Sequence, residues 1–172
     1  MVIIQRLIKH NTSPRVHDIN CLVIHKTAVK MMEGSKDAEN TLGWFASEKS
    51  GASAHYVIDN DGTIYLCVPD FMVAWHAGKS VIHGIPEVNQ FSLGIELVGL
   101  DKEEMPDAQM EALLELCAEK CYEHKIPLNR VVGHSHIAIP PGRKSDPGVL
   151  FDWFNFLNTL GAKISEKEII GG

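Results

Sequence analysis

Residues 131–148 read V-V-G-H-S-H-I-A-I-P-P-G-R-K-S-D-P-G. The two valines predict the end of a buried strand, and Gly133 allows the backbone to turn so that His134 projects beyond that end. The Pro-Pro-Gly run at 140–142 stops regular structure and turns the chain back toward the histidine. Three charged residues follow the turn: Arg143, Lys144 and Asp146. A histidine near an aspartate, with a lysine two residues before that aspartate, is typical of a metal-dependent hydrolase.

Two other apolar runs predict strands that place a polar side chain in the same region. The run at 19–25, I-N-C-L-V-I-H, is rich in β-branched residues and predicts a buried strand that ends in His25. The run at 91–99, F-S-L-G-I-E-L-V-G, predicts a second buried strand with Glu96 in its middle. Burying a carboxylate costs several kcal/mol unless it is paired, and its pKa then rises. We therefore expect His25 and Glu96 to belong to a functional site.

These residue types match the needs of a zinc hydrolase. Catalytic zinc accepts two imidazoles and one carboxylate and keeps its fourth position for water, and His25, His134 and Asp146 meet that count. Glu96 would be the general base that takes a proton from the water, because the metal lowers the pKa of that water to about 7. Lys144 would face the negative charge that develops on the substrate carbonyl.

The rest of the chain predicts helices and a hairpin around such a sheet. Apolar residues at helical spacing predict two amphipathic helices, one over 37–48 and one over 107–124. Asp37 would be the N-cap of the first helix. Strand-like runs at 54–58 and 63–68 flank D-N-D-G, a strong hairpin signal. Pro147 predicts the start of a last helix, whose inner face would comprise Leu150, Trp153, Phe154 and Leu157.

The segment 74–90 is interrupted by two glycines and a proline and predicts a long irregular loop. Long irregular segments in compact domains are usually functional loops or lids. Trp75 and His76 stand side by side at its start, where they would stack on a sugar ring or bond a carbonyl, although a tryptophan packed against the sheet is an equal alternative.

Composition indicates one globular domain: the chain has 172 residues, of which 45% are hydrophobic and 22% are charged. A net charge of −6 at pH 7 without a Lys/Arg block argues against nucleic acid as a partner, and no apolar run is long enough for a membrane span. The four cysteines lack C-x-x-C spacing and are expected to be reduced. No feature indicates an obligatory protein partner.

We expect a single domain over 1–172, with a core of about 19–160 and a C-terminal tail at 161–172. The N-terminal arm, 1–18, lacks the continuous apolar stretch and the small-residue cleavage site of a signal peptide, so we interpret its start as a strand or an amphipathic arm.

Taken together and in this order, the motifs resemble the type-2 N-acetylmuramoyl-L-alanine amidase family. This family includes bacterial AmpD-type enzymes, phage amidases and animal peptidoglycan recognition proteins. The resemblance covers roughly residues 19–160. It rests on I-H-K-T-A at His25, S-A-H-Y-V-I-D at Tyr56, W-H-A-G at Trp75, S-L-G-I-E-L-V-G at Glu96, D-A-Q-M-E-A-L at Asp107, V-V-G-H at His134, G-R-K-S-D-P-G at Asp146 and F-D-W at Trp153.

The resemblance implies an α/β fold in which helices flank a central mixed sheet. It implies hydrolysis of the amide between N-acetylmuramic acid, or its 1,6-anhydro form, and L-alanine, in a peptidoglycan fragment or in peptidoglycan. One Zn²⁺ would be held by the residues matching His25, His134 and Asp146, with Glu96 as base and Lys144 as the oxyanion-stabilising lysine. We expect substrate contacts from four residues: Tyr56, Trp75, His76 and Arg143.

The chain departs from the family pattern in two places. The family usually has an acidic residue two positions after the second ligand, where this chain has His136, and Ile139-Pro140 looks like a two-residue insertion. His136 is therefore an alternative metal ligand or a group that supports a ligand. Asp146, where phage enzymes and recognition proteins often have cysteine, indicates the AmpD-like branch.

Three functions remain open at this point. The first is a cytoplasmic bacterial amidase that acts on anhydro-muropeptides in cell-wall recycling. The second is an amidase that cuts intact peptidoglycan, as an endolysin or an exported or periplasmic hydrolase would if a leader precedes this chain. The third is a non-catalytic peptidoglycan-binding protein. Such proteins typically lose a zinc ligand, whereas this chain keeps the whole set.

Overall fold

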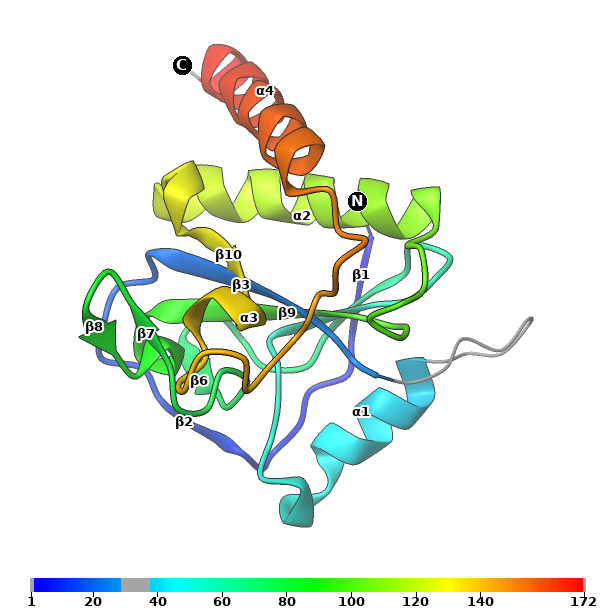
Figure 1. The fold of residues 1–172 in the computed structure, drawn as a ribbon, viewed down its shortest axis with the longest axis vertical. Coiled ribbons are helices and arrows are strands. Elements are labelled where there is room, and N and C mark those ends of the chain that lie inside the picture. The colour runs from blue at the N-terminus through cyan, green and yellow to red at the C-terminus, as the bar shows by residue number, and fades with distance from the viewer. Residues whose placement is uncertain (1, 29–37, 172) are drawn as a thin grey trace.

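The computed structural model describes residues 2–28 and 38–171 and places a six-stranded sheet at the centre of the molecule (Figure 1). In spatial order its strands are β1 (Ile3–Gln5), β5 (Ile64–Leu66), β4 (Tyr56–Ile58), β9 (Ser92–Leu97), β3 (Cys21–Lys26) and β10 (Val131–Gly133). Strands β4 and β5 are antiparallel, and the other pairs of this sheet are parallel. The sheet is mixed, as predicted, and the start of the N-terminal arm forms its edge strand.

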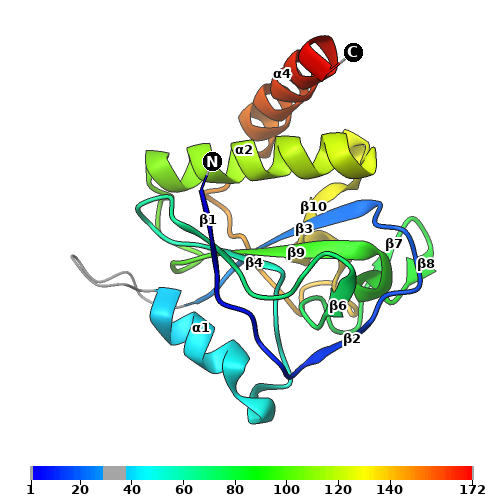
Figure 2. The same cartoon turned by 180° about the vertical axis from the view of Figure 1, so that it is seen from behind.

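Helices cover both faces of the sheet. Helix α2 (Asp107–His124) lies across one face, and α4 (Trp153–Gly171) packs on the outer side of α2 (Figures 1 and 2). Helix α1 (Ala38–Ala46) lies on the opposite face. In the described part of the chain, no helix is both long enough and apolar enough to span a membrane.

The alternation of side chains along β3 and β9 separates the core from the site. Leu22 and Ile24 of β3, with Ile95 of β9, belong to the apolar cluster under α2. Because successive strand residues point to opposite faces, His25 and Glu96 point away from α2. These two residues are directly opposite each other in the parallel β3–β9 ladder. The two central strands therefore bury one face in the core and place a histidine and a carboxylate side by side on the other.

Smaller elements surround that second face. Strand β2 (Thr12–Pro14) pairs with β6 (Met72–Ala74), and β7 (Val81–Ile82) pairs with β8 (Ile85–Pro86). A short helix, α3 (His134–Ile137), follows β10. Three 3-10 turns complete the list: Glu48–Ser50, Val88–Phe91 and Leu128–Arg130.

The β7–β8 hairpin corrects the expectation of an irregular loop over 74–90. Its two turn residues, His83 and Gly84, both have positive φ, at 48° and 80°. Tight hairpin turns that match strand twist need this conformation. Asn-Gly, Asp-Gly and Gly-X are the usual sequences of such turns. Because His-Gly is not one of them, the sequence did not predict this hairpin.

Other predicted elements are confirmed with small shifts. The helix at 107–124 has the predicted bounds, and β4 and β5 form the predicted hairpin. The helix predicted over 37–48 is α1, and its predicted N-cap, Asp37, lies outside the described residues. The Cys117 and Cys121 side chains, on the inner face of α2, are free thiols buried in the core.

The last helix begins later than predicted, at Trp153 instead of Pro147. Gly148 has a φ of +98°, which is incompatible with a right-handed helix. The Asp152 carboxylate instead accepts the backbone N–H of Asn155 at 3.1 Å and acts as an N-cap. The expected inner position of Phe154 is also wrong, because this side chain is 76% exposed. Phe156 and Leu160 are buried instead, and the helix continues through 161–171.

Candidate metal centre and pocket

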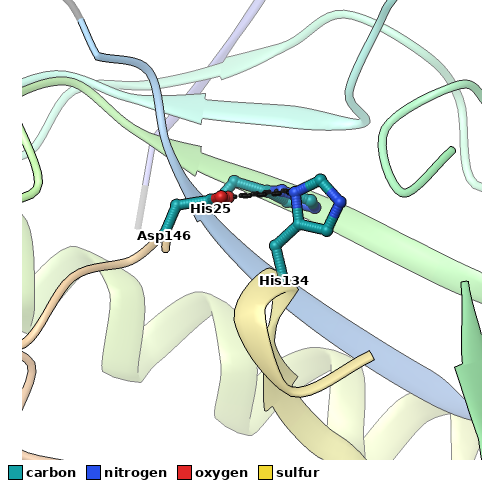
Figure 3. Close-up of side chains that lie close together, drawn as sticks. All are labelled: His25, His134 and Asp146. Atoms are coloured by element: carbon teal, nitrogen blue, oxygen red, sulfur yellow. Dashed lines mark hydrogen bonds and ion pairs between the residues drawn. The ribbon is translucent and has the colours of Figure 1, made fainter. Parts of the chain in front are cut away.

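Three side chains converge beyond the ends of β3 and β10 (Figure 3). His25 comes from β3, His134 is the first residue of α3, and Asp146 lies in the loop before α4. The Nδ1 atoms of the two histidines are 3.0 Å apart, and Asp146 Oδ2 lies 3.0 Å from Nδ1 of His25 and 3.1 Å from Nδ1 of His134. All three residues are buried. The structure thus brings together the three residues predicted as metal ligands.

This triangle fits a metal ion. Tetrahedral ligands at 2.0–2.1 Å from zinc would lie about 3.3 Å from one another, close to the three observed separations. Burial raises the pKa of Asp146, but the adjacent His134 and His25 rings outweigh burial and hold that pKa below its usual value, so the carboxylate stays ionised. Burial lowers the pKa of His25, which leaves a neutral imidazole. Two imidazoles and one carboxylate form a donor set that could hold one divalent ion.

Gly133 allows β10 to end against the loop that contains Asp146. A Cβ atom at Gly133 would lie 2.7 Å from Cδ of Pro147 and 2.9 Å from Cζ2 of Trp153. The backbone N–H of Ser135 also donates to the carbonyl oxygen of Asp146 at 3.0 Å. The V-V-G-H motif therefore brings the start of α3 and the aspartate loop into direct contact.

Glu96 lies beside this triangle. Its Oε2 atom is buried and has no hydrogen-bond partner among the residues that the structure describes. Burial, reinforced by the negative charge of Asp146 and opposed by Lys144, raises the pKa of Glu96 to about 8. A partly buried carboxylate with one unpartnered buried oxygen and a pKa near neutrality has the properties of a general base.

A pocket of about 540 Å³ opens over these four residues. Arg143 and Lys144 line one side, and Asn40, Thr41 and Trp44 of α1 line another. The Thr41 hydroxyl is buried and has no hydrogen-bond partner within the described parts of the chain, 2–28 and 38–171, and Trp44 is 56% exposed. The α1 residues were missed at the sequence level, although a tryptophan beside the apolar face of an amphipathic helix was an available signal. The size of the pocket suits a small organic ligand.

Residues 15–149 match the family described as N-acetylmuramoyl-L-alanine amidase. The chain belongs to this amidase family. It is 41% identical over 117 residues to the 1,6-anhydro-N-acetylmuramyl-L-alanine amidase AmpD of Enterobacter cloacae, which covers 68% of this chain and 61% of that protein. The chain therefore spans less than two thirds of the length of this relative.

Solved structures show the same amidase fold. A selenomethionine derivative of AmpD has a TM-score of 0.76 at 30% identity, covering 91% of this chain and 93% of that chain. The amidase AmiD from Escherichia coli, in complex with the substrate anhydro-N-acetylmuramic acid-L-Ala-D-γ-Glu-L-Lys, has a TM-score of 0.72 at 29% identity, covering 82% and 57%. The family and the fold predicted from the motifs are confirmed.

Within this amidase fold, Tyr56 lies outside the lining of the pocket, so its substrate contact stays a prediction that this position does not favour. In the β4–β9 ladder Tyr56 is opposite Ile95, whereas Val57 is opposite Glu96. The Tyr56 side chain therefore shares the α2 face of the sheet. Its hydroxyl donates to Oδ1 of Asp70 at 2.7 Å, and the ring lies under the Lys120 ammonium.

The other three residues expected to contact substrate have different surroundings: His76 and Arg143 line the pocket, whereas Trp75 does not. Trp75 is 42% exposed and lies outside the lining of the pocket. His76 borders the pocket but is buried, with its Nδ1 atom 3.0 Å from Nε2 of His25; burial and then the neighbouring His25 lower its pKa well below the usual value. Arg143 also borders the pocket, and its guanidinium donates to three backbone carbonyls, those of Ala77, Lys79 and Ile139.

His136 and Lys144 also have clear places in the amidase site. The Nδ1 atom of His136 accepts the backbone N–H of Gly133 at 3.1 Å, and its ring packs against Trp153. His136 therefore lies outside the ligand triangle, and the structure favours His134 over the alternative of His136 as the ligand. Lys144 is exposed at the pocket, where its ammonium can reach a bound molecule.

Proposed function

We propose that this protein is a zinc-dependent N-acetylmuramoyl-L-alanine amidase. It hydrolyses the amide between N-acetylmuramic acid, or its 1,6-anhydro form, and L-alanine in muropeptides. The observation that carries the proposal is the triangle of His25, His134 and Asp146 with the unpartnered Glu96 oxygen beside it in one pocket. Membership of the amidase family and the similarity to AmpD and AmiD support this activity.

The residues of the chain have defined roles in this reaction. When bound by the triangle, zinc supplies Lewis acidity, which lowers the pKa of water and polarises a carbonyl. Glu96 takes a proton from the attacking water while the water oxygen forms a bond to the carbonyl carbon. Glu96 then returns that proton to the L-alanine nitrogen as the carbon–nitrogen bond breaks. The Lys144 ammonium stabilises the negative charge on the carbonyl oxygen during attack.

The substrate is proposed to be a soluble anhydro-muropeptide in cell-wall recycling. The 540 Å³ pocket between α1 and the 143–146 segment suits a sugar–peptide fragment. The E. cloacae relative is named as a 1,6-anhydro-N-acetylmuramyl-L-alanine amidase, which also supports this substrate. All four cysteines are buried free thiols, which is typical of a reducing compartment and supports a cytoplasmic location.

Two substrates separate recycling from wall cleavage. The zinc-loaded protein is incubated with purified anhydro-muropeptide or with intact sacculi, and release of the stem peptide with a free L-alanine amine is measured by mass spectrometry. We expect rapid release from the fragment and slow release from sacculi. Equal rates per bond would favour the alternative of a hydrolase of intact peptidoglycan. No release from either substrate would overturn the amidase proposal.

A further inference from the structure

Two consecutive residues contact the Nε2 atoms of the two candidate histidine ligands: His76 contacts His25, and Ala77 contacts His134. The Nε2 atom of His25 lies 3.0 Å from Nδ1 of His76, and the Nε2 atom of His134 lies 3.0 Å from the carbonyl oxygen of Ala77. Both histidines turn Nδ1 toward Asp146. A neutral imidazole has one N–H and one lone pair. The partner at Nε2 therefore decides whether the Nδ1 lone pair is available to a metal.

For His134 the partner leaves no choice, because a carbonyl oxygen can only accept. Nε2 of His134 must carry the proton, and Nδ1 is left with its lone pair. For His25 the partner is another imidazole, which can donate or accept. The tautomer of His25 therefore depends on the tautomer of His76.

His76 belongs to a hydrogen-bond chain that runs from His25 through His76 and Ser92 to the carbonyl oxygen of Val88, and all its donors can point in the same direction. Nε2 of His76 lies 3.1 Å from Oγ of Ser92, and that hydroxyl lies 2.7 Å from the carbonyl oxygen of Val88. If His25 donates from Nε2, then His76 donates from Nε2 to Ser92, and Ser92 donates to Val88. Every proton in this arrangement has an acceptor, and the chain ends on a group that can only accept.

The opposite polarity would block metal binding at His25. If His76 carried its proton on Nδ1, it would donate to Nε2 of His25 and shift the His25 proton to Nδ1, where it would donate to Asp146. The Ser92 hydroxyl has a single proton, so it would then donate to His76 and leave the Val88 carbonyl. A proton on Nδ1 occupies the lone pair that a metal needs. Metal binding at the triangle therefore requires the first polarity, which also keeps the hydrogen bond from Ser92 to Val88.

The His76 ring is held in place by residues of its own. A Cβ atom at Gly94 would lie 2.4 Å from Cγ of His76, so the ring occupies space that only glycine leaves open on β9. The Oδ1 atom of Asn89 accepts the backbone N–H groups of His76 at 3.2 Å and of Ala77 at 2.8 Å. The imidazole is therefore fixed against the sheet, with one nitrogen toward His25 and the other toward Ser92.

We propose that His76 is a positioning residue of the metal centre. It accepts the Nε2–H of His25 and, through Ser92, holds His25 in the tautomer that presents Nδ1 to the metal. This inference rests on the proposed zinc site, but it concerns metal binding and not the cleavage of substrate. The two can therefore be tested separately.

The test is the zinc dissociation constant, measured by competition with a chromophoric chelator. Residues that hydrogen-bond to histidine ligands typically change metal affinity by 10–100-fold when they are replaced. We expect His76→Leu to weaken zinc binding by about 10–100-fold. His76→Asn places Oδ1 near the position of Nδ1 and keeps an acceptor, so we expect affinity within a few-fold of wild type. Ser92→Ala should give a smaller loss, and His136→Gln, outside the triangle, should give none.

Each outcome has a separate meaning. If wild type does not bind zinc, the proposed function fails. If wild type binds zinc and His76→Leu binds it equally well, the role of His76 fails while the amidase proposal stands. If His76→Asn is as weak as His76→Leu, the acceptor role is wrong. Circular dichroism of each zinc-free variant checks that it is folded.

A second measurement needs no variant. In the ¹⁵N-labelled zinc-bound protein, NMR identifies which ring nitrogen of each histidine carries the proton. We expect a proton on Nε2 of His25 and on Nε2 of His76. A His76 proton on Nδ1 would overturn the inference, even if the His76 variants fail to fold.

Discussion

His25 and Glu96 are directly opposite each other on adjacent parallel strands, on the face of the sheet that points away from α2. This register places a candidate metal ligand and a candidate base next to each other without any contribution from a flexible loop. The other two ligands, His134 and Asp146, then reach the pair from the far side of β3. The rigid part of the site is therefore a property of two central strands.

Replacing Glu96 tests its role as the base. We expect Glu96→Gln to lower kcat by about 10²–10⁴-fold, because the amide cannot take a proton from water. Zinc content should remain equal to that of wild type, since Glu96 is outside the ligand triangle. The measurements are steady-state hydrolysis of anhydro-muropeptide and metal analysis of the same sample. Near-normal turnover with zinc bound would exclude Glu96 as the base.

The same substitution should stabilise the metal-free protein in a pH-dependent way. Folding raises the pKa of Glu96 from 4.5 to about 8, so ionisation is more costly in the folded state. The cost is absent below pH 4.5, grows by about 1.4 kcal/mol per pH unit up to about pH 8, and is constant above that. We expect Glu96→Gln to exceed wild type in free energy of unfolding by an amount that increases from pH 5 to pH 8. Urea unfolding after chelation measures it, and a difference independent of pH would contradict the raised pKa.

The sequence predicted the site in the places where local pattern determines which way a side chain points. The β-branched runs at 19–25 and 91–99 indicated buried strands, and a functional group was expected at His25 in the first and at Glu96 in the second. The Pro-Pro-Gly turn likewise predicted that Asp146 returns to His134. These inferences need only a strand, its end and a reversal of the chain.

The remaining residues depend on long-range geometry that a single sequence does not contain. A shift of one residue in strand register moves a side chain to the opposite face, and the β4–β9 register places Tyr56 under α2. His76 was expected in the groove, but the space above Gly94 places it behind His25. The two histidines of the H-S-H motif look equivalent in the sequence. They separate only because α3 turns His136 back toward Gly133.

Tyr56 provides a direct test of its place under α2. Its hydroxyl donates to Asp70, which also pairs with Lys120 at 2.8 Å. We expect Tyr56→Phe to lower the free energy of unfolding by about 1 kcal/mol through loss of that hydrogen bond. Asp70 keeps its ion pair, and the kcat for muropeptide hydrolysis should be unchanged. A loss of kcat beyond tenfold with stability intact would place the hydroxyl in the reaction.

Two partly exposed tryptophans form a matched pair for the pocket. Trp44 lines the pocket and is 56% exposed, whereas Trp75 is 42% exposed and lies outside the pocket lining. We expect Trp44→Ala to raise KM for anhydro-muropeptide several-fold, because an exposed aromatic face is lost from the binding surface. Trp75→Ala should leave KM unchanged. A raised KM in Trp75→Ala with an unchanged KM in Trp44→Ala would instead indicate that the substrate binds beside Trp75, as the W-H-A-G motif predicted.

Zinc should stabilise the folded protein through Asp146. A ligand present at 100 times its Kd adds about 2.7 kcal/mol to the free energy of unfolding. For a domain of this size, that gain raises Tm by roughly 5–10 °C. We expect this rise for wild type, its reversal by a chelator, and its loss in Asp146→Asn.

Asp101→Asn is the control. It changes another carboxyl group of the same pocket, one outside the triangle, so zinc should still raise the Tm of this variant. Differential scanning fluorimetry with and without zinc measures all three proteins. A rise retained in Asp146→Asn and lost in Asp101→Asn would show that the metal lies elsewhere in the pocket.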